Sequence, residues 1–494
     1  MALFPQEFID STRASLGESA QVVLDALAGD ETVAALRANP AKIAADSLRK
    51  RFPAAGENVP WCGEAFYLEE RPAFSLDPLL HAGSYYVQDP SAMAVGSLAE
   101  GVIDSLEAPL NVLDLCAAPG GKSTALAAAL RPSDLLVANE VIGSRASILA
   151  ENLVKWGSVN TVVTNSDPKD FGKLNGCFDI IVTDVPCSGE GMFRKEPKSI
   201  AEWSPDNVNL CAARQRRIVA DVWPALKTGG YLIYSTCTFN SQENDGNVEW
   251  ICHELGAEVV LPTAAATSVG SIASPSAAPN AFCRLRKKTV GLQKHSSRQA
   301  EGGATNEADC VAENTALETK YGLQFAPGIT RGEGQYVALL RKTSPEVSIH
   351  IRAPKLPKRA ECGLLKGDMV AFQVATSAGT LIKGYPQQLA GEIRFFEENL
   401  KTIRSGVAVA QVKGRDLIPQ ADLALSVAFR QDVFPAVELS KEDALNFLRT
   451  QPLHLPDAPN GFLTVKYDGL PIGFVKNLGS RANNLFPQAW RLRM

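Results

Sequence analysis

The sequence predicts an α/β protein whose central domain is a doubly wound, mostly parallel sheet. Three observations predict this fold class. Between residues 108 and 239, apolar strand-like runs alternate with helix-like segments, which is the pattern of strand–helix–strand units. The strand-like runs are apolar almost throughout, as expected of strands that are buried on both faces. Each motif that could carry chemistry follows such a run, where ligands of open parallel sheets bind.

Length and composition limit the class of protein. A chain of 494 residues is too long for one ordinary domain. Its net charge of −5 means that any nucleic-acid binding must use local basic patches. The ten cysteines form no CxxC pair and the five histidines do not cluster near them, so neither a zinc site nor a disulfide framework is expected. With no secretory signal and no apolar run of ~18 residues, we expect a cytoplasmic protein with reduced thiols.

The N-terminal part, residues 1–75, is predicted to be a small α+β module. Apolar residues at three- and four-residue spacing predict helix over 8–29. A short strand is expected at 33–39 and a second helix at 40–52. The segment 74–99 then leads into the next domain.

The central domain is predicted to span residues 76–343. Its strands are expected at 111–117, 135–141, 161–167, 178–186 and 231–239, with helices at 120–130, 144–157 and 214–226. Residues 334–342 are expected to form a final strand that closes the sheet. An excess of Ala, Ser, Gly and Pro predicts a flexible insertion at about 262–320.

The C-terminal part is predicted to hold two further regions. Residues 344–425 contain several strand-like runs and form an intermediate β-rich region. Residues 426–494 contain one clear helix at 440–450 and strand-like runs over 461–479. The stretch 341–415 carries more Lys and Arg than Asp and Glu, which suits a surface that contacts RNA.

A glycine pair marks the first candidate site. The stretch CAAPGGK, residues 116–122, joins a predicted strand to a predicted helix. Glycine lets a ligand approach the backbone closely, and the first turn of the helix offers free N–H groups. The stretch is not GxGxxG, and no glycine stands five residues before Gly121, which excludes both a dinucleotide fingerprint and a P-loop.

Three carboxylates end three successive strands beyond this loop. Glu140 stands twenty residues after Gly120, where an acid can bind both ribose hydroxyls of an adenosine-type cofactor. Asp167 can reach the adenine amino group, and Asp184 ends the next strand. Any one of the three can be an ordinary turn residue, but the set beside the glycine loop predicts a cofactor site. S-adenosylmethionine fits better than a nicotinamide nucleotide because it needs no pyrophosphate loop.

Two cysteines follow buried strands, Cys187 in DVPC and Cys237 in STC. Amino-group methyltransferases often have an aromatic residue where Cys187 stands, so a thiol there favours a carbon target. Carbon 5 of a pyrimidine is a poor nucleophile, but a thiolate that adds to C6 turns the ring into an enamine whose C5 can attack a methyl sulfonium. A nearby acid must assist at N3. Spacing does not decide which cysteine attacks.

These motifs resemble a known family. Residues 116–122, 184–191 and 234–245 resemble the signature motifs of the NOP2/Sun (RsmB/NOP) family of RNA 5-methylcytosine methyltransferases. The stretch 439–492 resembles the PUA-like RNA-binding tail of the bacterial members that act on 16S ribosomal RNA. The resemblance implies a Rossmann-like class I methyltransferase domain, S-adenosyl-L-methionine as cofactor, and RNA, 16S rRNA or the small ribosomal subunit, as partner. We expect a monomer that binds no membrane.

The resemblance also implies roles for individual residues. Cys237 would attack C6 and Cys187 would help to resolve the adduct, whereas DNA cytosine methyltransferases attack from the cysteine of the PC motif. Asp184 would also bind the cytosine. The implied cofactor contacts are Cys116, Ala117, Ala118, Pro119, Gly120, Gly121, Lys122, Glu140, Asp167 and Asp184. No metal is expected.

Alternatives remain open at this stage. A tRNA cytosine-C5 methyltransferase would share the same motifs. A non-catalytic RNA-binding ribosome assembly factor could retain the pocket, although the intact Cys237, Cys187 and Asp184 argue against it. Arg194 and Lys195 are expected either to contact phosphate or to lie on the surface, and the other cysteines to be buried or incidental.

Overall fold

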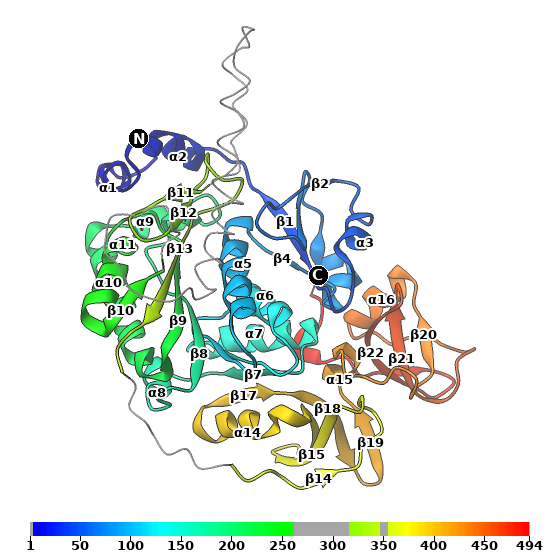
Figure 1. Cartoon of the computed structure of the whole chain (residues 1–494). Coiled ribbons are helices and arrows are strands. Elements are labelled where there is room, and N and C mark those ends of the chain that lie inside the picture. Colours follow the sequence, from blue (N-terminus) through cyan, green and yellow to red (C-terminus); the bar gives the residue numbers. More distant parts are fainter. Residues whose placement is uncertain (1–2, 261–315, 346–353, 494) are drawn as a thin grey trace.

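The computed structural model describes residues 3–260, 316–345 and 354–493. Within these residues the chain forms four sheets, and the largest has ten strands. Figure 1 shows this sheet at the centre, with the N-terminal sheet to its upper right, the sheet of residues 359–419 below it and the sheet of residues 436–484 at the right. The insertion predicted at 262–320 lies outside the described residues except for 316–320.

The central sheet confirms the predicted fold class. Its order is β11-β12-β13-β9-β8-β5-β6-β7-β17, and β10 also pairs with β13. The strands from β9 to β7 are parallel, whereas β13 and β17 run antiparallel to their neighbours. Its strands are β5 (Asn111–Asp114), β6 (Leu135–Asn139), β7 (Thr161–Thr164), β8 (Phe178–Asp184), β9 (Leu226–Thr236), β10 (Ala257–Val259), β11 (Leu317–Glu318), β12 (Leu323–Phe325), β13 (Gln335–Lys342) and β17 (Thr402–Ser405).

One prediction about the edges of this sheet was wrong, and one edge strand was not predicted. The strand at 334–342 does not close the sheet, because β12 and β10 pair with the free side of β13. The sequence also gave no sign that the intermediate region would add a strand. β17 pairs with β7 and extends the sheet at its opposite edge.

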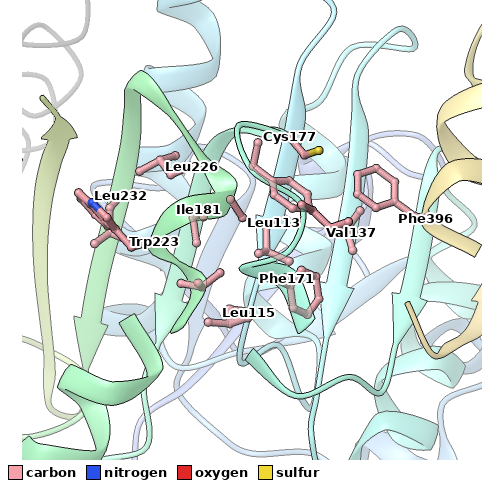
Figure 2. Close-up of a cluster of buried hydrophobic side chains, with 14 of the residues drawn as sticks. Leu113, Leu115, Val137, Phe171, Cys177, Ile181, Trp223, Leu226, Leu232 and Phe396 are labelled. Carbon is pink, nitrogen blue, oxygen red and sulfur yellow. The ribbon is translucent and has the colours of Figure 1, made fainter. Parts of the chain in front are cut away.

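Helices cover both faces of the sheet (Figure 1). On one face lie α5 (Pro90–Ser105), α6 (Gly121–Ala129) and α7 (Gly143–Trp156), and on the other lie α8 (Pro168–Phe171), α10 (Pro205–Val222) and α14 (Ala390–Asn399). Successive strand residues therefore enter different cores: Val112 packs below α5 and α6, whereas Leu113 packs with Phe171 (Figure 2). Burial on both faces explains why these strands are apolar almost throughout.

The N-terminal helices pack on the central domain. The single helical stretch predicted over 8–29 is wrong, because α1 (Gln6–Leu16) and α2 (Ala20–Ala28) are separated at Gly17, whose φ of 56° ends α1. Phe8 of α1 is fully buried against Phe193 and Trp203, with ring centroids 5.0 and 5.4 Å away. These helices therefore support loops of the central domain.

The N-terminal sheet has the order β2-β3-β1-β4. Its elements are β1 (Ala34–Ala38), α3 (Ala45–Arg49), β2 (Ala55–Asn58), β3 (Ala65–Leu68), α4 (Pro78–His81) and β4 (Tyr85–Val87). β4 lies beyond residue 75, where the sequence predicted the module to end. The buried Arg37 of β1 donates hydrogen bonds to the Gly121 carbonyl and the Thr124 hydroxyl in the first turn of α6. The sheet is thereby docked against the CAAPGGK loop.

The C-terminal part forms one five-stranded sheet and one four-stranded sheet. Their strand orders are β14-β15-β16-β18-β19 and β20-β21-β22-β23. Their elements are β14 (Arg359–Ala360), β15 (Met369–Thr376), β16 (Gly379–Pro386), β18 (Val407–Lys413), β19 (Asp416–Pro419), α15 (Ala421–Leu425), β20 (Ala436–Glu438), α16 (Lys441–Leu448), β21 (Gly461–Tyr467), β22 (Leu470–Asn477) and β23 (Ala482–Asn484). Tyr467 and Leu470 pack on the N-terminal sheet. The chain thus returns from its end to its beginning.

Gly83, where the N-terminal module meets α7 of the central domain, gives a test of how closely the two pack. We expect Gly83→Ala to lower the midpoint of thermal unfolding by ~5 °C or more, because the new Cβ would overlap the Lys155 carbonyl oxygen and because Gly83 has a φ of +68°. Gly63→Ala is the control, since nothing lies within 4 Å of its Cβ position. Equal melting of both variants by differential scanning calorimetry would contradict this tight docking.

Candidate active site

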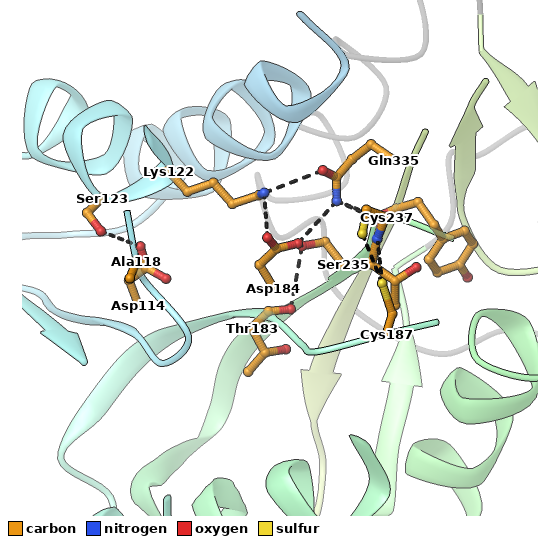
Figure 3. Close-up of polar contacts among 12 residues, drawn as sticks. Asp114, Ala118, Lys122, Ser123, Thr183, Asp184, Cys187, Ser235, Cys237 and Gln335 are labelled. Carbon is orange, nitrogen blue, oxygen red and sulfur yellow. Dashed lines mark hydrogen bonds and ion pairs between the residues drawn. The ribbon is translucent and has the colours of Figure 1, made fainter. Parts of the chain in front are cut away.

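The carboxyl ends of β8 and β9 bring the two cysteines together. Cys187 follows β8 and Cys237 follows β9, and these strands are parallel neighbours. Their Sγ atoms lie 3.0 Å apart, and the backbone N–H of Cys237 points at the Cys187 sulfur at 3.4 Å (Figure 3). The hydrogen bond with Cys237, together with burial, raises the pKa of Cys187. Cys187 therefore keeps its proton more readily than a thiol in water.

A buried glutamate locks the two cysteine loops to each other. Glu190, 1% exposed, lies in the loop after β8. Its carboxylate accepts hydrogen bonds from the backbone N–H groups of Phe239 and Asn240 in the loop after β9, at 2.8 and 3.0 Å. The indole N–H of Trp203 donates to it at 2.8 Å. Trp203 is buried and makes this polar contact besides its packing.

A second buried glutamate makes the reciprocal connection. Glu243 follows β9 and accepts the backbone N–H of Ser188, next to Cys187, at 3.1 Å. The side-chain amides of Gln215 and Asn240 donate to it at 2.6 and 2.8 Å. Burial raises the pKa of Glu243, although these donors favour its ionised form. Each cysteine loop thus carries a carboxylate that the other loop stabilises.

An ion pair lies beside the thiols. Lys122 Nζ is 2.7 Å from Asp184 Oδ2, and Oδ1 of Asp184 accepts the Ser235 hydroxyl at 2.9 Å. Burial alone would lower the pKa of Lys122, but the Asp184 carboxylate outweighs it, so the pKa is raised and the side chain stays protonated. Figure 3 shows both side chains pointing toward Gln335, whose amide contacts each of them.

The CAAPGGK loop joins β5 to α6 as predicted. Gly120 has a φ of +115° at the start of α6, a conformation that favours glycine. Behind the loop, Asp114 ends β5 and is fully buried. Its Oδ2 accepts the Ser123 hydroxyl at 2.7 Å, whereas its Oδ1 has no hydrogen-bond partner among the described residues. Burial raises the pKa of Asp114 to about 7. Such a carboxylate favours the arrival of a cationic group.

The two predicted strand-end acids differ in their surroundings. Glu140 is nearly buried, accepts the backbone N–H of Ile142 at 2.9 Å and lies 3.4 Å from Arg145. Asp167 is half-exposed and caps α8 by accepting the backbone N–H of Lys169. The capping contact is the ordinary role of an aspartate before a helix. Glu140 nevertheless follows β6, the neighbour of β5, and Asp167 follows β7, the next strand along the sheet.

The sequence analysis did not predict several residues that shape the site. Glu190 and Glu243 lie in the motif stretches 184–191 and 234–245, and Gln335 lies in the predicted strand 334–342. Nothing in their spacing marked them as buried. The phosphate-contact and surface interpretations of Arg194 are both wrong, because it forms a buried ion pair with Glu333 at 2.9 Å. Of the other cysteines, Cys283 and Cys310 lie outside the described residues. Burial raises the pKa of Cys116, which makes it a poor nucleophile.

The described part of the chain holds neither a metal-binding cluster nor a membrane-spanning helix. In residues 3–260, 316–345 and 354–493, no set of three or more His, Cys, Asp and Glu side chains is arranged to hold a metal ion. No helix in these ranges combines the length and apolar character needed to cross a bilayer.

Three family models match the chain in the order of its domains. The model described as 16S rRNA methyltransferase RsmB/F matches residues 105–274. The N-terminal domain of 16S rRNA methyltransferase RsmF matches residues 4–90, and the methyltransferase RsmF PUA domain matches residues 434–492. The first match contains the glycine loop and both cysteines.

Curated relatives and solved structures agree with these matches. Ribosomal RNA small subunit methyltransferase F of Pectobacterium carotovorum is 30% identical, covering 99% of this chain and 96% of its own. The protein of that name from Klebsiella pneumoniae is also 30% identical, covering 98% and 96%. The solved structure of NSun6 from Pyrococcus horikoshii with SFG has a TM-score of 0.50 at 18% identity, covering 69% of this chain and 99% of its own, and supports the fold.

With its domains in the same order and nearly its whole length aligned, this chain belongs to the ribosomal RNA small subunit methyltransferase F family of enzymes.

Proposed function

We propose that this methyltransferase transfers a methyl group from S-adenosylmethionine to carbon 5 of a cytosine in 16S ribosomal RNA. The observation that carries the proposal is the pair of thiols at 3.0 Å beside the Lys122–Asp184 pair. Transfer to an amino group or an oxygen needs no nucleophilic thiol, whereas C5 is activated by addition of a thiolate to C6. The names of the relatives support small-subunit rRNA as the substrate class.

The cofactor would bind along the carboxyl ends of β5, β6 and β7. When bound, S-adenosylmethionine supplies an electrophilic methyl group on its sulfonium. The unpartnered Oδ1 of Asp114 fits the cationic amino group of its amino-acid part. Glu140 would accept hydrogen bonds from the ribose hydroxyls. The exposed apolar side chains of Val141 and Ile142 would cover the adenine. The loop 116–122 and Asp167 complete the proposed contacts.

Cys237 is the proposed nucleophile. As a thiolate it forms a bond to C6 of the cytosine, and C5 of the resulting enamine then takes the methyl group. A base, solvent water at the open edge of the site, then takes the C5 proton, and the C6–sulfur bond breaks with its electron pair on the Cys237 sulfur, which restores the aromatic ring. The hydrogen bond between the Cys187 and Cys237 thiols supports this division of roles, because the raised pKa of Cys187 favours a neutral thiol there. Cys187 can then donate its proton as the Cys237 sulfur departs.

Asp184 and Lys122 would hold the base during these steps. The Asp184 side chain is partly exposed, so its carboxylate remains reachable by a flipped cytosine. Lys122 stays protonated and adds a positive charge where the addition at C6 places electrons on the ring. A base in a duplex must be flipped at a cost of a few kcal/mol, which favours a cytosine in a loop.

The flanking regions are proposed to bind RNA. The N-terminal module predicted at 1–75, the β-rich region at 344–425 and the PUA-like domain at 426–494 surround the catalytic domain at 76–343. A tRNA substrate would use the same chemistry and is the second candidate within this class. A non-catalytic assembly factor has no need for two thiols and an ion pair at one strand edge.

Covalent trapping tests the nucleophile. With small-subunit rRNA carrying 5-fluorocytidine and S-adenosylmethionine, we expect the native chain to form a stable protein–RNA band, because fluorine cannot leave C5 as a proton does. Cys237→Ala should abolish the band. Cys187→Ala should keep it and should also accumulate adduct on natural cytidine, since release lacks its proton donor.

Cys252→Ala, a half-buried thiol outside the site, serves as the control and should behave like the native chain. A band lost only with Cys187→Ala would reverse the two roles. No band with native protein on rRNA or tRNA would contradict the covalent mechanism.

The proposed cofactor site predicts a pH dependence of binding. The pKa of Asp114 is raised from 3.8 to about 7 by burial, so its carboxyl is largely protonated below pH 7 in the free protein. A cationic ligand group favours the ionised form, so affinity should rise as pH increases from ~5.5 to ~7 and then level off. Calorimetry should also detect proton release on binding. Asp114→Asn should weaken binding and remove both effects, and a pH-independent native affinity would exclude this contact.

A further inference from the structure

We propose that Gln335 is a positioning residue for methyl transfer, whose neutral amide fixes the Asp184 carboxylate relative to the strand end that carries Cys237. This inference rests on the proposed roles of Asp184 and Cys237. Gln335 is the first residue of β13 and is 2% exposed. β13 lies antiparallel to β9, so its first residue reaches the same sheet edge at which β9 ends.

The amide of Gln335 joins three groups from three different elements (Figure 3). Its Nε2 donates to the Thr236 carbonyl oxygen at 2.8 Å and to Asp184 Oδ1 at 3.3 Å. Its Oε1 accepts from Lys122 Nζ at 3.4 Å. Thr236 immediately precedes Cys237, so the amide links the carboxylate, the ammonium group and the nucleophile's backbone.

The chemistry of these partners fixes the orientation of the amide. An ammonium group only donates hydrogen bonds, whereas a carbonyl oxygen and a carboxylate only accept them. The amide oxygen must therefore face Lys122 and the NH₂ group must face Thr236 and Asp184. A side chain of this length that carries one acceptor and two donor hydrogens satisfies all three partners, and an apolar or anionic side chain does not.

Gln335 differs from the other two donors of Asp184 because its single amide group also binds the backbone carbonyl next to Cys237. Ser235, which donates to the same Oδ1, lies on β9, and Lys122 reaches Oδ2 on a long side chain from α6. Gln335 comes from β13 and contacts β8 and β9 together. It holds the carboxylate at a fixed distance from the Cys237 backbone, which productive attack on one cytosine requires.

Two substitutions separate hydrogen bonding from side-chain volume. Gln335→Glu keeps the shape but sets a carboxylate against the Asp184 carboxylate and the Thr236 carbonyl, whereas Gln335→Met removes both donor and acceptor. We expect each to lower kcat by ~10- to 100-fold at pH ~8, the effect of losing hydrogen bonds to charged groups. The dissociation constant for S-adenosylmethionine, measured by calorimetry, should change less than ~3-fold.

The pH profile then distinguishes positioning from a structural role. The charged groups that contact position 335 are Lys122 from α6 and Asp184 from β8, and the Cys237 thiol after β9 is close enough to Lys122 to raise its pKa. In Gln335→Glu, one proton shared with Asp184 restores a donor between the two carboxyl groups, and burial favours that proton. The loss in kcat relative to the native chain should therefore shrink as pH falls to ~6, whereas the loss in Gln335→Met should not change with pH.

Gln411→Glu is the control for the pH profile, because it makes the same change where the amide donates to two backbone carbonyls of a separate sheet. Its kcat relative to the native chain should not vary with pH. Native kcat in Gln335→Met, or parallel pH-independent losses in both Gln335 variants, would overturn the inference. Formation of 5-methylcytidine by the native chain, measured by nucleoside mass spectrometry, tests the proposed function separately, because only the ratio of variant to native rate reports on Gln335.

Discussion

The geometry of the site depends on two buried carboxylates that must find donors. Glu190 and Glu243 are almost completely removed from water, and a buried carboxylate is tolerated only where several hydrogen bonds surround it. The loop after β8 carries one glutamate and the loop after β9 carries the other, and each uses N–H groups of the opposite loop. The two loops therefore cannot separate without leaving a buried charge unpartnered, and the distance between the cysteine sulfurs follows from this constraint.

Packing from outside the catalytic domain reinforces this arrangement. The α1–α2 pair covers Phe193 and Phe239, which follow the two cysteine loops. Gly191 lies against Gly334, and a Cβ on Gly191 would come within 2.6 Å of the Cys237 carbonyl oxygen. Arg37 of the N-terminal sheet binds the first turn of α6, directly after the glycine loop. The N-terminal part thus contacts both halves of the site, which connects RNA binding by this part, as proposed, to the geometry of catalysis.

The sequence alone determined the layered fold, the parallel strands and the ends at which the motifs lie. These features follow from local rules: strands buried on both faces are apolar, and a glycine with positive φ is needed where β5 turns into α6. The motif residues Cys187, Cys237, Asp184 and Lys122 could also be assembled at one edge, because the carboxyl ends of neighbouring parallel strands must meet. Their roles in catalysis came from the resemblance and remain proposals.

Only the tertiary structure decided what surrounds those residues. Glu190, Glu243 and Gln335 look like ordinary polar residues in the sequence, since burial depends on contacts between segments far apart in the chain. The same is true of β17, which joins the central sheet from a region more than two hundred residues away from β7, and of Arg194, whose partner Glu333 lies in another loop. Local patterns fix where each strand ends. The long-range cost of burying a charge fixes which side chains must meet there.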